Sequence, residues 1–182
     1  ITSLQSINGT FRAVDIYGNP NLDPETATTY SVGGIFEIGN FKATIDYWNF
    51  DFQDPITTDP VAGMVSKLFS NGIGAGAQLN CAGAGPIFSR FTFSSGKTCA
   101  QFNALASPAA TASGEIQRLR TETVNGAGVK TSGIDVIADY TFDEFLGGSL
   151  GIGGTATYVI EYKTEATEVA GVTVAPAFDA VG

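Results

Sequence analysis

The chain has 182 residues, a net charge of −9 and a pI near 4.2, and it contains no histidine. The negative charge argues against a nucleic-acid-binding protein, which needs a basic surface, and the lack of histidine excludes any mechanism that requires an imidazole base or ligand within these residues. No window approaches the roughly 18 consecutive apolar residues of a membrane-spanning helix, although a mean hydropathy of +0.13 is compatible with membrane-spanning strands.

The first segment, residues 1–25, is predicted to be a loop. Its second half is rich in Asn and Pro, which mark turns. There is no initiator Met or charged, apolar export signal at Ile1, and no stop signal follows Gly182, so we expect the chain to be a piece of a longer mature protein.

A hairpin is predicted over residues 26–52. Apolar and polar side chains alternate along 26–38 and again along 41–52, as they do on strands with one apolar face. Between the two segments stands Gly39-Asn40, a two-residue hairpin turn signal.

Residues 53–114 are predicted to form a long loop, because the alternation stops and Gly, Ala, Ser and Asn dominate. Within it, residues 61–69 are compatible with one short helix and residues 87–93 with one short strand. Cys81 and Cys99 also lie here, with no histidine and no third cysteine to complete a metal site, so they are expected to form a disulfide; two unpaired thiols are the alternative. A disulfide indicates an oxidising compartment.

A second hairpin is predicted over residues 115–163. Residues 115–125 form a polar strand that leads into the clearest pattern in the chain, the alternating segments 130–142 and 149–163 around a turn at 143–148. These segments exceed the usual strand length of about 5–6 residues, and aromatic residues lie near the ends of their apolar face. Residues 164–182 are again predicted to be a loop.

This order of long loops and short turns is typical of an all-β, antiparallel transmembrane β-barrel. The turns at 39–40 and 143–148 then lie at the periplasmic side, and the segments 1–25, 53–114 and 164–182 are extracellular loops. The apolar face contacts lipid, with Tyr162 near the outer interface. A soluble β-sandwich with one buried face is the alternative, and it would need no aromatic girdle.

Two motifs resemble those of the TonB-dependent outer-membrane receptors. The first is Gly18-Asn19-Pro20-Asn21-Leu22-Asp23-Pro24-Glu25-Thr26, and the second is Gly128-Val129-Lys130-Thr131-Ser132-Gly133-Ile134-Asp135. Their spacing of about a hundred residues, one strand plus one long loop, also fits that family, and the likeness covers roughly residues 18–163.

The resemblance implies a 22-stranded barrel in the bacterial outer membrane, closed by an N-terminal plug and driven by the TonB complex. It implies a receptor that binds a scarce solute, of the siderophore, cobalamin, glycan or peptide class, and imports it to the periplasm. A passive structural or adhesin-type barrel is the alternative, and an enzyme of the outer-membrane barrel type is a third. We expect no enzymatic activity, cofactor or metal.

Candidate ligand-binding residues are Trp48 and Phe52, which face the barrel interior at the outer end of a strand, and Arg118 and Arg120, which share one face of the polar strand. Aromatic rings can stack on a solute and arginines can pair with a carboxylate. The alternatives are a hydrophobic seat for the long loop, and pairing of the arginines with Glu115 or Glu122. The interior carboxylates, Glu37, Asp46, Asp135 and Asp139, either contact a substrate or plug, or simply make the interior polar.

Overall fold

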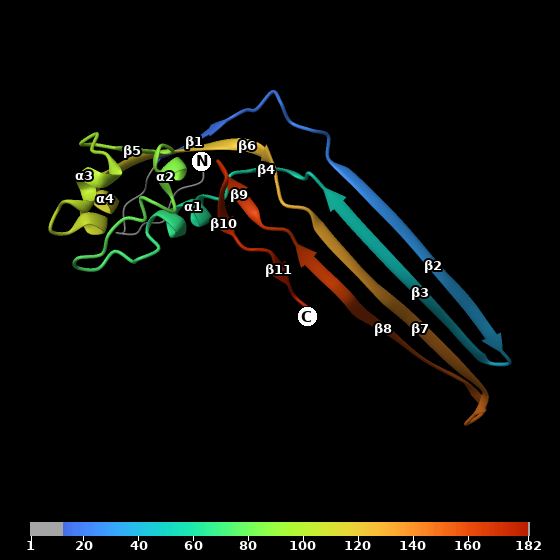
Figure 1. Cartoon of the computed structure of the whole chain (residues 1–182). Helices are drawn as coiled ribbons and strands as arrows, with labels where there is room; N and C mark the ends of the chain where they lie inside the picture. The colour runs from blue at the N-terminus through green and yellow to red at the C-terminus, as the bar shows by residue number, and fades with distance from the viewer. Residues whose placement is uncertain (1–12, 182) are drawn as a thin grey trace. The chain divides into compact units, whose positions relative to one another are not determined.

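The computed structural model describes residues 13–181, and the chain divides into two compact units (Figure 1). Residues 25–55, 127–165 and 177–181 form what we name the sheet unit. Residues 13–24, 56–126 and 166–176 form what we name the loop unit. Each unit is therefore assembled from three separate stretches of chain. None of the helices in the described part of the chain is long and apolar enough to cross a membrane.

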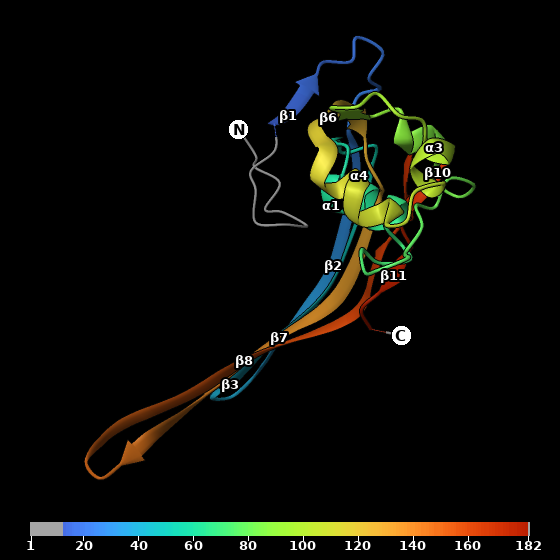
Figure 2. The ribbon, with the colours of Figure 1, turned by 90° about the vertical axis from the view of Figure 1, so that its left-hand side faces the viewer.

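The sheet unit is an antiparallel sheet in the order β11-β8-β7-β3-β2. Its long strands are β2 (Thr26–Ile38), β3 (Phe41–Gln53), β7 (Val129–Phe145) and β8 (Gly148–Thr164), and a short edge strand is β11 (Phe178–Asp179). These long strands confirm the alternating segments of the sequence to within three residues at each end. Among the described residues the sheet twists strongly without closing into a barrel (Figure 2).

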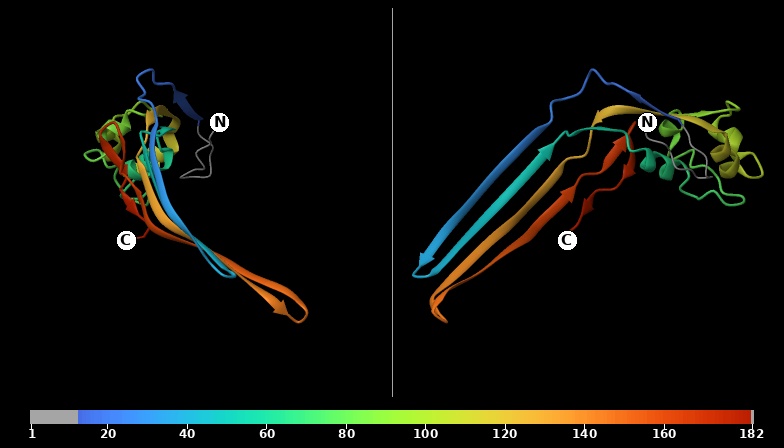
Figure 3. Two further views of the ribbon diagram at one scale, coloured as in Figure 1. Left: turned by 90° about the vertical axis from the view of Figure 1, so that its right-hand side faces the viewer. Right: turned by 180° about the vertical axis from the view of Figure 1, so that it is seen from behind.

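Both hairpin turns lie at the same end of this sheet (Figure 3). Gly39, with a φ of 60°, turns β2 into β3, and Leu146 and Gly147, with φ of 49° and 83°, turn β7 into β8. The backbone N–H of Thr141 donates to the carbonyl of Asn40 at 3.1 Å, so the β2–β3 turn contacts β7 at Thr141. The β7–β8 hairpin extends a few residues beyond this contact. The same-end placement predicted from the pattern is confirmed.

One face of the sheet unit is apolar over four successive rungs, and we name it the apolar face. Residues directly opposite each other on neighbouring antiparallel strands share a face, so each such set forms a rung across the sheet. The apolar rungs are Val32–Tyr47–Ile134–Tyr158, Gly34–Ile45–Val136–Ala156, Phe36–Ala43–Ala138–Gly154 and Ile38–Phe41–Tyr140–Ile152. We name the opposite side, which carries Asp46, Asp135 and Asp139, the polar face.

A β-bulge in β8 changes one assignment made from the sequence. The register shifts between Ser132 and Gly133, so that Gly133 lies opposite Val159, while Ser132 lies opposite Glu161 and Thr131 opposite Tyr162. An extra residue in one strand reverses the faces beyond it. Tyr162 therefore shares the polar face, and its predicted place on the lipid-facing side is wrong.

The loop unit contains more regular structure than the sequence indicated. Its helices are α1 (Val61–Leu68), α2 (Gly85–Phe88), α3 (Cys99–Asn103) and α4 (Pro108–Glu115), and its strands are β1 (Ala13–Tyr17), β4 (Ile56–Thr58), β5 (Phe91–Phe93), β6 (Ile116–Asn125), β9 (Thr167–Val169) and β10 (Val172–Ala175). The helix predicted at 61–69 is confirmed. The strand predicted at 87–93 is wrong in its first half, because Pro86 at the start of α2 favours a helical turn and only 91–93 is extended.

Strand β6 organises the loop unit. It pairs in parallel with β1 and antiparallel with β4 and β5, so it does not continue into the sheet unit as a single hairpin with residues 130–163. Its polar appearance in the sequence hides the buried Ile116, Leu119 and Thr121, which alternate with exposed arginines. Three segments predicted to be loop contain strands. Residues 13–17 pair in β1–β6, residues 167–169 and 172–175 pair in β9–β10 around a turn at Ala170 and Gly171, and residues 178–179 pair with β8 in the sheet unit.

The loop unit has its own hydrophobic core. Met64, Leu68, Ile87, Phe102 and Leu119 are completely buried, and Val169, from β9, is 1% exposed. Burial of each large side chain contributes about 1.5–3 kcal/mol before the entropy cost of ordering the chain. The core therefore explains how a stretch rich in Gly, Ala and Ser folds instead of remaining a loop.

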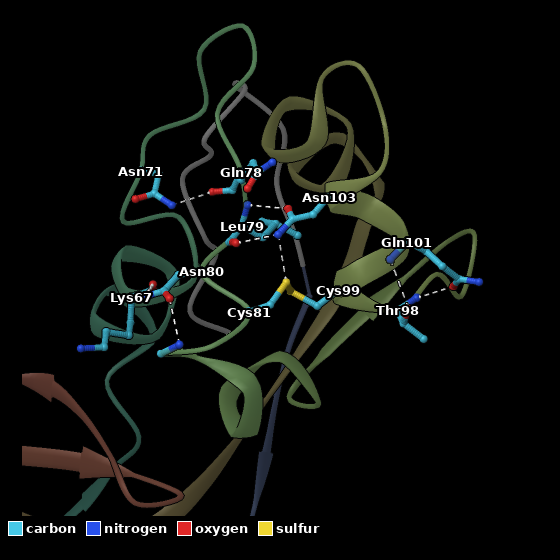
Figure 4. Close-up of a disulfide and its surroundings, with 11 residues drawn as sticks. Lys67, Asn71, Gln78, Leu79, Asn80, Cys81, Thr98, Cys99, Gln101 and Asn103 are labelled. Atoms are coloured by element: carbon cyan, nitrogen blue, oxygen red, sulfur yellow. Dashed lines mark hydrogen bonds between the residues drawn. A yellow bond between two sulfur atoms is a disulfide. The ribbon is translucent and has the colours of Figure 1, made fainter.

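A disulfide joins Cys81 and Cys99, which pack against this core (Figure 4). Its S–S distance is 2.06 Å and its Cα–Cα distance is 5.7 Å. The prediction of a disulfide is confirmed. Beside it, Asn103 accepts from the Leu79 N–H at 2.8 Å and donates to the Leu79 carbonyl at 2.9 Å. Thr98 and Gln101 form a capping box that begins α3 and so fixes Cys99 in its first turn.

Candidate functional site

The apolar face of the sheet unit has the dimensions of a lipid-facing wall. From Ile134 to Phe142 β7 advances eight residues, which is about 27 Å along the strand and roughly 20 Å in height at the tilt of about 35–45° usual for barrels. Val32, Ile38 and Tyr158 on this face are 68%, 77% and 68% exposed. No charged side chain interrupts the rungs between them. In water such a surface would associate, whereas in a bilayer it is solvated by lipid.

The polar face carries carboxylates in register. Asp46 on β3 lies directly opposite Asp135 on β7, and Asp135 accepts a hydrogen bond from the Thr157 hydroxyl at 2.6 Å. The Asp46 side chain lies over Gly33, where a Cβ atom would come within 1.9 Å of its Oδ1. Two rungs further toward the turns, Asp139 lies opposite Lys42. The sheet thus has one face for lipid and one for water, as the alternation predicted.

An aromatic strip lies on the polar face at the end of β3 away from the turns. The rings of Trp48 and Phe50 are 5.7 Å apart between centroids, and those of Phe50 and Phe52 are 6.2 Å apart and nearly parallel at 8°. The Trp48 indole lies over Gly133, which stands opposite it and has no side chain; a Cβ there would meet the indole at 2.5 Å. We name Trp48, Phe50 and Phe52 the aromatic strip.

Tyr162 belongs to the same region of the polar face, and the sequence analysis missed it. Its rung is Phe50–Thr131–Tyr162, so it stands on the face that Phe50 occupies. The available signal was Gly133 inside a strand, since an isolated strand glycine often marks a bulge or a close approach. The bulge and the Trp48 contact both occur at this residue.

Arg118, in the loop unit, is paired with a residue far away in the sequence. Its Nε donates to Asp15 Oδ2 at 2.6 Å, and its Nη2 contacts Asp15 Oδ1, in a two-pronged pair across the parallel β1–β6 ladder. The Arg118 guanidinium holds the pKa of Asp15 below its ordinary value, chiefly through the hydrogen bonds. The expected partner Glu115 instead accepts from Ser95 and Lys97.

Arg120 pairs with Glu122, with Nη2 2.7 Å from Oε1. This is the alternative to ligand binding that was given for the arginines from the sequence. Its guanidinium also lies 4.5 Å from the centre of the Tyr17 ring. Glu122 is held from the other side by Arg90 in a bidentate pair of 2.6 and 3.1 Å. The hydrogen bond from Arg90, followed by the nearby charges, lowers the pKa of Glu122.

The buried Asp59 completes this charged cluster. It is 3% exposed and accepts the Glu122 backbone N–H at 3.0 Å, and Arg90 Nη1 lies 3.9 Å from its Oδ2. Both candidate arginines therefore already have carboxylate partners, which stabilise β6 in its place. An anionic solute would have to compete with those partners.

The predicted site residues thus fall into two separate groups. Trp48 and Phe52 come together with Phe50 on the sheet unit, and Arg118 and Arg120 share one strand of the loop unit. Among residues 13–181, no group of three or more His, Cys, Asp or Glu side chains could hold a metal ion. The arrangement offers stacking surfaces and charge, which suit noncovalent recognition.

The chain matches one family model, described as TonB dependent receptor-like, beta-barrel, over residues 2–179. Neither the comparison with curated proteins nor the comparison with solved structures gives a match. The match covers both units, so the helical segments of the loop unit fall within the same family region as the long strands.

Proposed function

We propose, because the chain belongs to the family of TonB-dependent receptor-like β-barrels, that it forms part of an outer-membrane receptor that binds a scarce solute at the cell surface and imports it. That family is an outer-membrane family of Gram-negative bacteria. The observation that carries the proposal is the family match over residues 2–179, and the two-faced sheet supports it physically. No covalent chemistry is involved in this function.

In the proposed receptor the sheet unit is a part of the wall of a 22-stranded barrel. The open edges of its sheet pair with further strands, since unpaired edges are not tolerated in lipid. The hairpin turns at 39–40 and 146–147 lie in the periplasm, and the loop unit is extracellular. A plug domain inside the barrel couples the receptor to the TonB complex.

Solute recognition is proposed at the outer ends of the strands. Trp48 and Phe52 offer ring surface on the polar face there, and the loop unit with Arg118 and Arg120 is presented to the outside. Binding residues commonly lie on loops and strand ends held by a rigid scaffold, and aromatic and arginine anchors often carry most of the binding energy. The solute classes compatible with the scaffold are siderophores, cobalamin, glycans and peptides.

The test is solute uptake by whole cells. Cells with and without the receptor are given labelled iron chelates, cobalamin, oligosaccharides and peptides, with the inner-membrane proton gradient intact or collapsed. We expect one class to be accumulated only when both receptor and gradient are present. Uptake that survives collapse of the gradient would identify a passive barrel, and surface attachment without uptake would identify an adhesin.

The binding residues are tested in the same cells. Truncating Trp48 and Arg118 to Ala should weaken solute binding, each by more than about 1 kcal/mol, while the amount of assembled receptor stays the same. Normal binding and uptake by cells carrying both truncations would place the site on other parts of the receptor.

A further inference from the structure

We infer that the polar face of the sheet unit takes a solute that carries a positive charge beside a flat apolar or aromatic ring. The inference rests on the proposed function and adds to it the charge class of the solute. It uses the aromatic strip and the carboxylates on the rung next to it, all of which lie within the sheet unit.

The aromatic strip supplies the ring surface. Phe50 and Phe52 remain 37% and 36% exposed although they face away from the apolar side of the sheet. Exposed rings on the water-facing side of a wall are costly unless something covers them. Flat apolar groups stack well on such rings, and a cation over a ring face is attracted by its quadrupole.

The rung beside the strip is acidic. Asp46 and Asp135 are directly opposite each other, one rung from Trp48 and Gly133, which is about 7 Å along the strands. Like charges directly opposite on neighbouring strands destabilise a sheet. The ion pairs formed within residues 13–181 include neither carboxylate, so no lysine or arginine of the described chain compensates this rung.

A third carboxylate on the polar face, Asp139, lies further from the aromatic strip and has a cation on its rung. Asp139 lies opposite Lys42, whose ammonium group pairs with Glu37 on the neighbouring strand at 3.0 Å. There the sheet supplies its own cation. The rung of Asp46 and Asp135, by contrast, carries no lysine or arginine. An incoming positive charge there would be attracted by both carboxylates and could still lie over the Trp48 indole.

This combination selects by charge. A solute with a cationic group and a ring satisfies both features at once, a neutral solute satisfies only the strip, and an anionic solute is repelled by the acidic rung. Attraction by exposed carboxylates is screened by salt, so the selectivity should fall as ionic strength rises.

The experiment uses the full-length receptor in lipid nanodiscs and three bicyclic probes of similar size. These are the cation 1-methylquinolinium, the neutral 1-methylnaphthalene and the anion 1-naphthoate, with Kd measured by calorimetric titration. We expect the cation to bind at least tenfold more tightly than the neutral probe and the anion to bind most weakly. Equal affinities of the three probes for the unaltered receptor would overturn the inference, whatever the behaviour of any variant.

Variants then locate the selectivity. Replacing both carboxylates, Asp46→Asn with Asp135→Asn, should abolish the tenfold preference and leave the affinity for the neutral probe unchanged. The matched control Asp139→Asn should retain the preference. If the double variant keeps the preference, or lowers the unfolding temperature of the receptor while the preference stays, the acids serve a positive charge of the receptor itself and the inference is overturned.

The outcome is distinguishable from failure of the proposed function. Gradient-dependent uptake of a solute that has no positive charge would uphold the receptor function and refute the inference. Loss of gradient-dependent uptake for all solutes, with the probe preference intact, would refute the import function and retain the charge-selective surface.

Discussion

An arginine placed on the apolar face should disrupt insertion, whereas one placed on the neighbouring residue should not. Val136 and Ile137 are consecutive on β7 and lie on opposite faces, with Val136 in the rung Gly34–Ile45–Val136–Ala156. Both are apolar β-branched residues, so intrinsic strand preference changes equally in the two variants. The pair isolates the face of the sheet as the variable.

The expected free-energy cost of the Val136→Arg substitution follows from the distance of residue 136 from the bilayer midplane. The rungs of the apolar face between Ile134 and Phe142 are centred on Ala138, and Val136 is one rung from that centre, about 5 Å from the midplane after allowing for strand tilt. An arginine facing lipid costs about 2–4 kcal/mol at the midplane and less toward the interfaces. We therefore expect Val136→Arg to cost about 2–3 kcal/mol, a roughly 30- to 150-fold shift in the folding equilibrium, and Ile137→Arg about 1 kcal/mol or less.

The assay is reversible folding of the whole receptor into lipid vesicles, followed by urea titration of each variant. The expected result is a clearly lower midpoint for Val136→Arg and a much smaller decrease, or none, for Ile137→Arg. Equal losses at both positions, or a larger loss at Ile137, would refute the assignment of the two faces, and with it the placement of the aromatic strip on the side away from lipid.

Other predictions concern the loop unit and the strip. Replacing both Cys81 and Cys99 by Ser should destabilise the loop unit by about 3 kcal/mol, since the bridge spans 18 residues; amide exchange should accelerate there while the long strands stay protected. Because the pKa of Glu122 is lowered from its ordinary 4.5 in the folded state, its contribution to stability is present above about pH 4.5 and is lost as the pH falls toward the lowered folded value. The loop unit should therefore loosen as the pH falls below about 4.5, and the same exchange measurement on Glu122→Gln should show a smaller change with pH; an unchanged pH response would contradict this role. Gly133→Ala should cost about 1–3 kcal/mol and alter Trp48 fluorescence, because the new Cβ meets the indole, whereas Gly151→Ala, with open space around it, should do neither.

The sequence alone was sufficient to locate the four long strands of the sheet unit. Long alternation of apolar and polar residues specifies strands and their faces through local geometry, and Gly39-Asn40 specifies a tight turn, so β2, β3, β7 and β8 could be located without any tertiary information. The disulfide was also accessible, because the chain has only two cysteines. In the same way the aromatic strip followed from the spacing of Trp48 and Phe52.

The loop unit required the tertiary structure. Its helices are short, and its core joins Leu119 of β6 to Val169 of β9, residues fifty positions apart that no local pattern connects. The partner of Arg118 was missed for the same reason, since Asp15 lies 103 residues away. Burial of side chains from distant segments overrides weak local preferences, so a composition that reads as loop folds around a core.

The face of Tyr162 shows the limit most clearly. Side chains along a strand alternate between the two faces with a period of two residues. A single extra residue therefore moves every side chain beyond it to the opposite face. Which residue is extra depends on pairing with the neighbouring strand, at Gly133, where the absence of a side chain leaves room for the Trp48 indole. The sequence by itself determined that these segments are strands with two unlike faces; only the contacts between strands decided where the faces exchange, because register is a property of the pair and not of either strand.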